Sequence, residues 1–170
     1  LSITGSGNGL DANSPAVNIT DLSVSDADDA IALNRFDESG VTTDIDITGS
    51  QSSFTSVGDG VDLSGLDGTT GSNPTVDVEV ANVSMQDVTN NGINADNLGS
   101  SNSLDLTLRV DGVTIDGDGA GGSAIGLELA NAGQVDNFDL TINDQTPSTF
   151  KQLATGIAIT DTADTTITSE

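Results

Sequence analysis

The chain contains no cysteine, histidine, tryptophan or tyrosine, and only three of its 170 residues are basic. The absence of cysteine excludes disulfide bonds. Without histidine or cysteine, Ser-His-Asp and Cys-His nucleophilic sites and imidazole or thiolate metal sites are also excluded. The absence of tryptophan and tyrosine removes the aromatic platforms on which sugars stack. These absences leave few routes to catalysis.

The three basic residues, Arg35, Arg109 and Lys151, stand against 27 acidic residues, which gives a formal net charge of −24. Such a surface repels phosphate backbones and anionic lipids, so nucleic acid and membrane surfaces are excluded as partners. No apolar run approaches the roughly 18 residues that a membrane helix needs. We therefore expect no membrane insertion by this segment.

Aspartate supplies most of the negative charge, since only four of the acidic residues are glutamate. This bias favours a protein of strands and turns, because aspartate is common in turns and glutamate favours helices. It would suit calcium, which prefers oxygen ligands, and it equally suits solubility in salty or extracellular surroundings. Disorder is rejected, because the 34% of hydrophobic residues lie in ordered alternations.

A short pattern recurs along the chain: a small residue, a branched apolar residue, any residue, then an apolar or small residue. Its five copies have their branched residues spaced by 30, 32, 32 and 32 positions. A degenerate copy, Gly9-Leu10-Asp11-Ala12, precedes them. The five copies are Ala30-Ile31-Ala32-Leu33, Gly60-Val61-Asp62-Leu63, Gly92-Ile93-Asn94-Ala95, Ala124-Ile125-Gly126-Leu127 and Gly156-Ile157-Ala158-Ile159. A fixed period in this range predicts a repeat architecture.

Apolar and polar residues alternate with the period of strands between these copies. One repeat from Ser103 to Gly133 predicts three strands, with the chain turning at Asp111-Gly112 and looping over 116–123. The predicted fold is all-β, a right-handed parallel β-helix of five to six coils of about 32 residues with three short strands per coil. A sandwich would need evenly spaced hairpin signals, and a propeller would need about 40 residues and four strands per repeat. The alternating stretches are Val17–Val24, Val41–Ile47, Val76–Met85, Leu104–Ile115 and Val135–Ile142.

The repeat also predicts which side chains stack inside the solenoid. Ile93 and Ile125 should be neighbours in adjacent coils, with Cα atoms roughly 5 Å apart. The small residue before each branched one should lie at a crowded corner, and the residue after it should face outward. Two inward columns are expected, one of Ile31, Val61, Ile93, Ile125 and Ile157, the other of Leu33, Leu63, Ala95, Leu127 and Ile159.

These rungs, joined by turns rich in Asp, Asn, Gly, Ser and Thr, resemble the right-handed parallel β-helix passengers of bacterial autotransporters and related adhesins. The resemblance covers essentially the whole chain and implies a secreted, surface-attached shaft. Pectate-lyase-like enzymes and phage tailspikes use the same kind of coil, so an enzymatic alternative stays open. The Phe-x-x-Asn repeats of chlamydial relatives are absent.

Candidate sites are few. Asp116-Gly117-Asp118-Gly119 resembles the start of a calcium loop, with aspartates at alternate positions and glycines that allow the bend, which makes Asp116 and Asp118 candidate metal ligands. A plain glycine-rich turn is the competing interpretation, because Ala120 replaces the third ligand and Glu128 falls one position late. Carboxylate pairs for glycoside hydrolysis exist among Asp26, Asp28, Asp29, Asp59 and Asp62, as chance alone would produce.

We therefore expect one β-helical repeat domain over residues 1–170, a segment of a longer protein. Its expected function is a structural or adhesive shaft segment of an extracellular bacterial surface protein, able to assemble end to end. Expected partners are copies or adjacent repeats of the same protein, surface glycans or other cells. We expect no catalytic residue and no cofactor, with calcium as the one ion to test. The alternative is a polysaccharide-acting β-helix enzyme or a tailspike-type depolymerase.

Overall fold

The computed structural model describes residues 1–5, 7–12, 16–34, 43–66, 74–96, 98, 104–119, 122–130, 135–142, 145–160 and 164–169. These residues form strands joined by turns, with no helix among them. No helix in the described part of the chain could therefore cross a membrane. The strands are β1 (Ser2–Thr4), β2 (Leu10–Ala12), β3 (Ala16–Thr20), β4 (Ser23–Asn34), β5 (Thr43–Gly65), β6 (Thr75–Val88), β7 (Asn91–Asn94), β8 (Leu104–Asp111), β9 (Thr114–Gly117), β10 (Ile125–Leu129), β11 (Val135–Ile142), β12 (Thr149–Lys151), β13 (Thr155–Ile159) and β14 (Asp164–Ser169).

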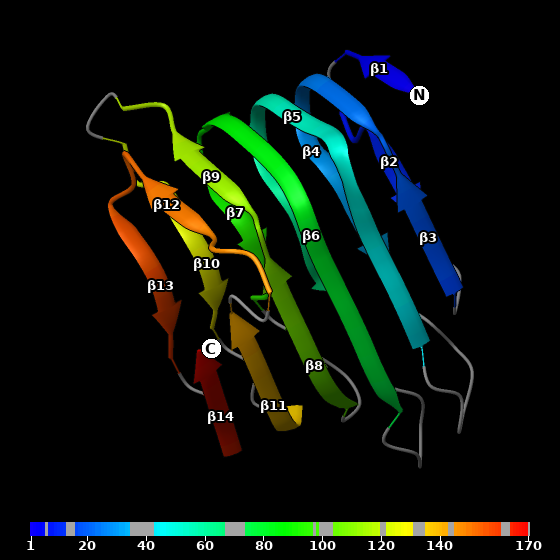
Figure 1. Ribbon diagram of the computed structural model, residues 1–170, viewed down its shortest axis with the longest axis vertical. Coiled ribbons are helices and arrows are strands. Elements are labelled where there is room, and N and C mark those ends of the chain that lie inside the picture. Colours follow the sequence, from blue (N-terminus) through cyan, green and yellow to red (C-terminus); the bar gives the residue numbers. More distant parts are fainter. Residues whose placement is uncertain are drawn as a thin grey trace.

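The strands pair in parallel from one turn of the chain to the next, so the molecule is a parallel β-solenoid with three sides (Figure 1). Side 1 contains β3, the start of β5, the start of β6, β8, β11 and β14. Side 2 contains β1, the start of β4, the middle of β5, the end of β6, β9 and β12. Side 3 contains β2, the ends of β4 and β5, β7, β10 and β13.

The solenoid has four full turns, which begin on side 2 at Val24, Phe54, Met85 and Ile115 and end at Phe150. Their lengths are 30, 31, 30 and 35 residues. A shorter turn of 21 residues, from Ile3 to Val24, precedes them, and an incomplete turn follows. The predicted β-helix is thus confirmed, with fewer full turns than the five to six expected. Strands β4, β5 and β6 also bend round corners, where separate short strands were predicted.

Stacked apolar columns fill the interior, and their members in the full turns are almost completely buried. Because each side chain lies directly above its equivalent in the previous turn, every coil covers the apolar surface of its neighbours. One column per side shows the arrangement: Val17, Ile45, Val78, Leu108, Leu140 and Ile167 on side 1; Ile3, Val24, Phe54, Met85, Ile115 and Phe150 on side 2; Leu10, Ile31, Val61, Ile93, Leu127 and Ile157 on side 3.

The corners explain why Asp, Asn and Gly are so common. Between sides 1 and 2 the chain bends at Asp21, Gly49, Asn82 and Gly112, each with a positive φ. Asp, Asn and Gly adopt this left-handed conformation at the lowest cost, so they recur where successive turns bend at the same place. The predicted turn at Asp111-Gly112 is confirmed, and its Gly112 has a φ of 62°.

The predicted register is wrong in the fourth copy of the repeat. Ile93 pairs with Leu127, and Ile125 pairs with Asn91, so Ile125 lies two residues away from the predicted neighbour. Leu127 is fully buried, whereas Ile125 is partly exposed. The cause is packing between sides 2 and 3, because a Cβ on Gly126 would lie 2.5 Å from Phe150 Cδ1 and 2.4 Å from Gly156 O.

A column of small residues therefore runs along side 3 against the bulky column of side 2, as the crowded-corner prediction required. It contains Gly9, Ala30, Gly60, Gly92, Gly126 and Gly156. A Cβ at Gly60 would meet Met85 Sδ at 2.4 Å, and a Cβ at Gly92 would meet Ile115 Cδ1 at 2.5 Å. Gly126 was predicted to face outward but is buried in this column, and Leu129 takes the place predicted for Leu127.

Candidate functional site

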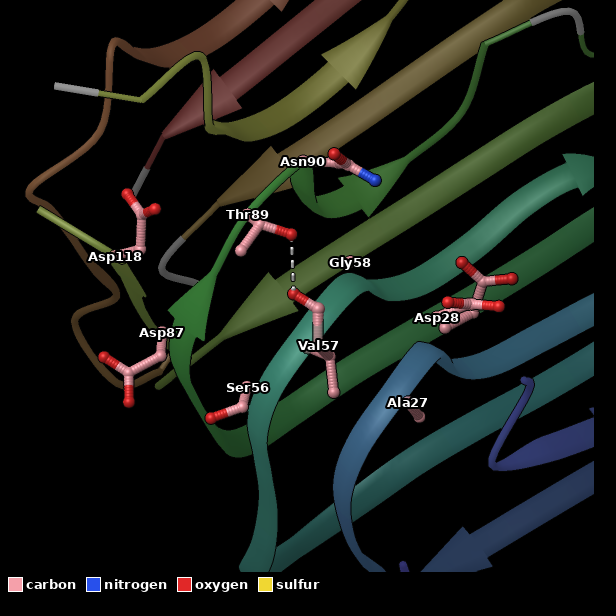
Figure 2. Close-up of a pocket in the computed structure, with 10 residues that line it drawn as sticks. Ala27, Asp28, Ser56, Val57, Gly58, Asp87, Thr89, Asn90 and Asp118 are labelled. Atoms are coloured by element: carbon pink, nitrogen blue, oxygen red, sulfur yellow. Dashed lines mark hydrogen bonds between the residues drawn. The ribbon is translucent and has the colours of Figure 1, made fainter. Parts of the chain in front are cut away.

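A groove of about 550 Å³ lies at the corner between sides 2 and 3 and spans several successive turns (Figure 2). Its charged groups are all carboxylates. Asp28 lies on one flank, and Asp87 and Asp118 lie on the other (Figure 2). The lining residues are Ala27, Asp28, Asp29, Ser56, Val57, Gly58, Asp87, Thr89, Asn90 and Asp118.

Backbone geometry at this corner creates the groove. Asp26, Ser56 and Asp87 have φ values of 57°, 55° and 54°, so the corner bends in the same way in three successive turns. Only glycine fits at position 58, because a Cβ there would lie 2.3 Å from the backbone oxygen of Asp28. The groove is thus a consequence of how the solenoid turns its corner.

Hydrogen bonds between turns fix the floor of the groove. Thr89 N donates to Val57 O at 3.0 Å, and Thr89 Oγ1 donates to the same oxygen at 3.4 Å (Figure 2). Asn90 N donates to Gly58 O at 2.9 Å. The floor is therefore hydrogen-bonded from one turn to the next.

Neighbouring carboxylates along side 3 perturb one another. The pKa of Asp29 is raised from 3.8 to about 6, chiefly by burial and then by the negative charges of Asp62, Asp59, Asp28 and Asp11. Asp29 pairs with Asp59 across adjacent strands. The negative charges of these neighbours therefore disfavour ionisation of Asp29.

Asp59 is 7% exposed, and both of its carboxylate oxygens accept hydrogen bonds from the next turn. Its Oδ1 accepts the Asn91 N–H at 2.9 Å, and its Oδ2 accepts the Asn94 Nδ2–H at 2.9 Å. Burial raises the pKa of Asp59 despite these two bonds. Asp59 thus links two turns of the solenoid, which is a structural use of a carboxylate that sequence analysis left among the chance pairs.

The two predicted metal ligands lie close in sequence but have different surroundings. Asp116 Oδ2 forms an ion pair with Lys151 Nζ at 3.0 Å, and Asp116 Oδ1 accepts a hydrogen bond from Gln152 Nε2 at 2.7 Å. Hydrogen bonds from Lys151 and Gln152 lower the pKa of Asp116. Asp118 lines the groove, and its backbone N–H donates to Val88 O at 3.2 Å.

Within the described ranges no three carboxylates are arranged to hold a metal ion. Both carboxylate oxygens of Asp116 already bind side chains of the next turn, Lys151 and Gln152. Calcium binding at this pair stays an untested alternative to a plain glycine-rich turn.

The cations do not converge on the groove. Arg109 is exposed on side 1 between Glu79 and Thr141 of the adjacent strands, whereas Lys151 is on side 2 beside Asp116. Arg35 lies outside the described residues. Arg109 and Lys151 therefore provide no paired cations of the kind that would hold a uronate.

Sequence analysis missed a row of hydroxyl side chains on the outside of side 2. The row has one member in each of six successive strands, and every member is Ser or Thr at the position just before the side 2 core column. The row could have been identified from the sequence once the core residues of side 2 were known, because each hydroxyl residue directly precedes one of them. Its members are Ser2, Ser23, Ser53, Ser84, Thr114 and Thr149.

Comparison of this chain with protein-family models, with curated proteins and with solved structures gives no match in any of the three. The fold and the site geometry are therefore the basis on which a function is argued.

Proposed function

We propose that this chain is a shaft segment of an extracellular bacterial surface protein, of the adhesin or autotransporter-passenger type, with a structural and adhesive role. The observation that supports it is the stacking of apolar columns through every described level of the solenoid. Within the described residues no buried side-chain N or O atom lacks a hydrogen-bond partner. Such an interior stabilises a rod and leaves the outer surface free to carry contacts.

The geometry suits a spacer. Six strand levels at about 4.8 Å give a rise of about 24 Å from first to last. Each coil is hydrogen-bonded to its neighbours, so rigidity is shared along the axis and does not depend on a single residue. The outer rows, such as the hydroxyl row of side 2, repeat polar groups at strand spacing. Repeated weak contacts with a surface glycan or another cell would add up along such a row.

The alternative is a polysaccharide-acting enzyme, and one observation favours it. Asp29 lies in the groove with a pKa of about 6, and a perturbed carboxylate in a groove is a candidate general acid. The structural role of Asp59 and the dispersed cations Arg109 and Lys151 argue against this reading, since nothing described in the groove would bind an acidic sugar. The shaft is therefore the better supported function.

One experiment separates the two. Beads coated with the folded chain are tested for attachment to bacterial cells and to purified surface polysaccharides, and the same protein is assayed for released reducing sugar. The shaft proposal expects attachment without sugar release, unchanged in Asp29→Asn. Sugar release that is lost in Asp29→Asn but kept in the matched variant Asp62→Asn would replace the shaft with the enzyme. Failure to attach to any cell or polysaccharide would refute the adhesive role.

A further inference from the structure

The outer face of side 1 carries two adjoining hollows whose chemistry differs from that of the corner groove. One hollow has a volume of about 380 Å³ and the other about 290 Å³. They share Thr107, Asp139 and Thr166, so they lie next to each other on the sheet of β6, β8, β11 and β14 (Figure 1). The larger volume falls within the range of about 300–1,000 Å³ that small-molecule sites occupy.

Strand pairing fixes the outer side chains of this face in three columns. Neighbouring strands are about 4.8 Å apart and alternate residues along a strand about 6.7 Å apart, so the outer groups form a regular grid. The shared residues Thr107, Asp139 and Thr166 belong to the middle column. The column on one flank contains Glu79, Arg109, Thr141 and Thr168. The column on the other flank contains Thr75, Asp105 and Asn137.

Two charged groups of the hollows are available to a ligand. Arg109 and Asp139 are exposed, and within the described part of the chain neither side chain forms a hydrogen bond or an ion pair. Asn137 is held in place, because its Nδ2 donates to Asp105 Oδ1 at 2.7 Å. The hollows therefore present a guanidinium that donates, a carboxylate that accepts and threonine hydroxyls that do both.

We propose that the two hollows bind sugar units of a neutral, hydroxyl-rich polysaccharide. This rests on the proposed function, to which it adds the site of attachment and the class of ligand. A sugar hydroxyl both donates and accepts, so adjacent hydroxyls can donate to Asp139 and accept from Arg109. Arg109 and Asp139 lie on adjacent strands in neighbouring columns, and Thr107 and Thr141 complete the same square of the grid. One sugar ring can therefore contact all four side chains.

The surrounding charges favour a neutral ligand over an acidic one. Arg109 lies opposite Glu79 in the adjacent strand. The other two columns add three more carboxylates, those of Asp77, Asp105 and Asp139. Four carboxylates around one cation repel a uronate or a phosphate, whereas uncharged hydroxyls meet no such repulsion. The corner groove offers no cationic donor, because its charged groups are all carboxylates.

Binding at this site depends on hydrogen bonds, because the chain has no tryptophan or tyrosine on which a sugar could stack. A single sugar is therefore a weak ligand. A polysaccharide presents many equivalent units, so a protein that leaves one unit is recaptured by the next. The test accordingly uses immobilised polysaccharides in place of free sugars.

Biolayer interferometry with the folded chain in solution measures this binding. Dextran, mannan and galactan on the sensor are the neutral probes, and alginate is the acidic probe. We expect binding to at least one neutral polymer and none to alginate. Binding should persist in molar salt, because no ion pair contributes to it. Absence of binding to all three neutral polymers, or binding to alginate as strong as to any of them, would overturn the proposal.

Two substitutions each remove one proposed contact. Arg109→Ala and Asp139→Ala should each raise the Kd for the bound polymer about tenfold, since a hydrogen bond to a charged group contributes on this scale. The matched controls are Lys151→Ala on side 2 and Asp44→Ala on side 1 outside both hollows. All four side chains are exposed, so none of the substitutions removes a core contact.

The controls should bind like the natural chain. Equal weakening in Arg109→Ala and Lys151→Ala, or in Asp139→Ala and Asp44→Ala, would show a general effect of net charge and refute the site. Unchanged binding in Arg109→Ala and Asp139→Ala would place the polymer elsewhere on the protein. A chain that attaches to cells in the bead test but binds no neutral polysaccharide would keep the shaft function and lose this site, so the two proposals can fail separately.

Discussion

Adding one methyl group at two positions of the same column should have opposite effects on stability. Gly126 and Gly156 occupy equivalent positions in successive turns, and neither has a positive φ. At Gly126 the new Cβ would lie 2.4 Å from Gly156 O and 2.5 Å from Phe150 Cδ1. At Gly156 it would meet nothing within 4 Å. The pair therefore isolates the clash from the general effect of replacing glycine by alanine.

The magnitudes follow from two opposed terms. Overfilling a packed core costs about 1–3 kcal/mol, and a backbone carbonyl, unlike the end of a flexible side chain, cannot move aside cheaply. Replacing glycine by alanine restricts the unfolded chain and stabilises by about 0.4–1 kcal/mol where the backbone tolerates it. We expect Gly126→Ala to lower the free energy of unfolding by about 1–2 kcal/mol and Gly156→Ala to raise it by about 0.5 kcal/mol.

Urea unfolding at low protein concentration and low salt, where the chain is kept monomeric, measures both values. In thermal melts the loss at Gly126 corresponds to a fall in Tm of about 2–8 °C for a chain of this size. Equal stability of the two variants would show that Gly126 is not packed against Phe150, and would restore the register in which Gly126 faces outward.

Three further predictions follow from the same structure. Leu127→Ala should destabilise by about 2–5 kcal/mol in urea melts and Ile125→Ala by about 1 kcal/mol or less, because Leu127 fills the core column; the reverse order would refute the observed register. Because the pKa of Asp29 is raised from 3.8 to about 6, the folded state favours its neutral form, and the resulting stabilisation is complete below about pH 4 and lost as pH rises through 6. Asp29→Asn should therefore gain about 1 kcal/mol at pH 7 after allowance for solvent screening and nothing at pH 3.5, and a gain independent of pH would contradict this cause. Millimolar calcium should raise Tm no more than sodium chloride of equal ionic strength, because Asp116 already binds Lys151 and Gln152; a rise of many degrees that Asp116→Ala with Asp118→Ala abolishes would establish a calcium site.

The fold was predictable because its main signals are local. Alternation of apolar and polar residues predicted the strands, as in Val135–Ile142, which coincides with β11. The Asp111-Gly112 pair predicted a corner, because few residue types adopt a positive φ at low cost. The repeat then indicated that these strands stack in parallel. Each of these inferences depends on residues close together in the sequence.

The register of the fourth turn was not predictable in the same way, because it is decided by contacts between two sides. Ala124-Ile125-Gly126-Leu127 matches the repeat pattern better than Gly126-Leu127-Glu128-Leu129 does. The second alignment prevails because the positions that face Ile115 and Phe150, Gly92 and Gly126, have no room for a side chain. The groove escaped prediction for a related reason, since its walls come from corners of several turns that only the folded chain brings together.

The spacing of the core columns explains why the repeat is only approximately periodic. In the first turn Ile3, Leu10, Val17 and Val24 follow at equal intervals of seven residues, so 21 residues suffice to close a three-sided coil. The step from side 2 to side 3 is also seven residues from Phe54 to Val61, but it is twelve residues from Ile115 to Leu127. Most of the additional length in the full turns falls between side 3 and side 1, where 14 residues separate Ile31 from Ile45. Seven residues is thus the shortest step that carries the core column from one side to the next, and the period of about 32 includes connections whose length the core does not constrain.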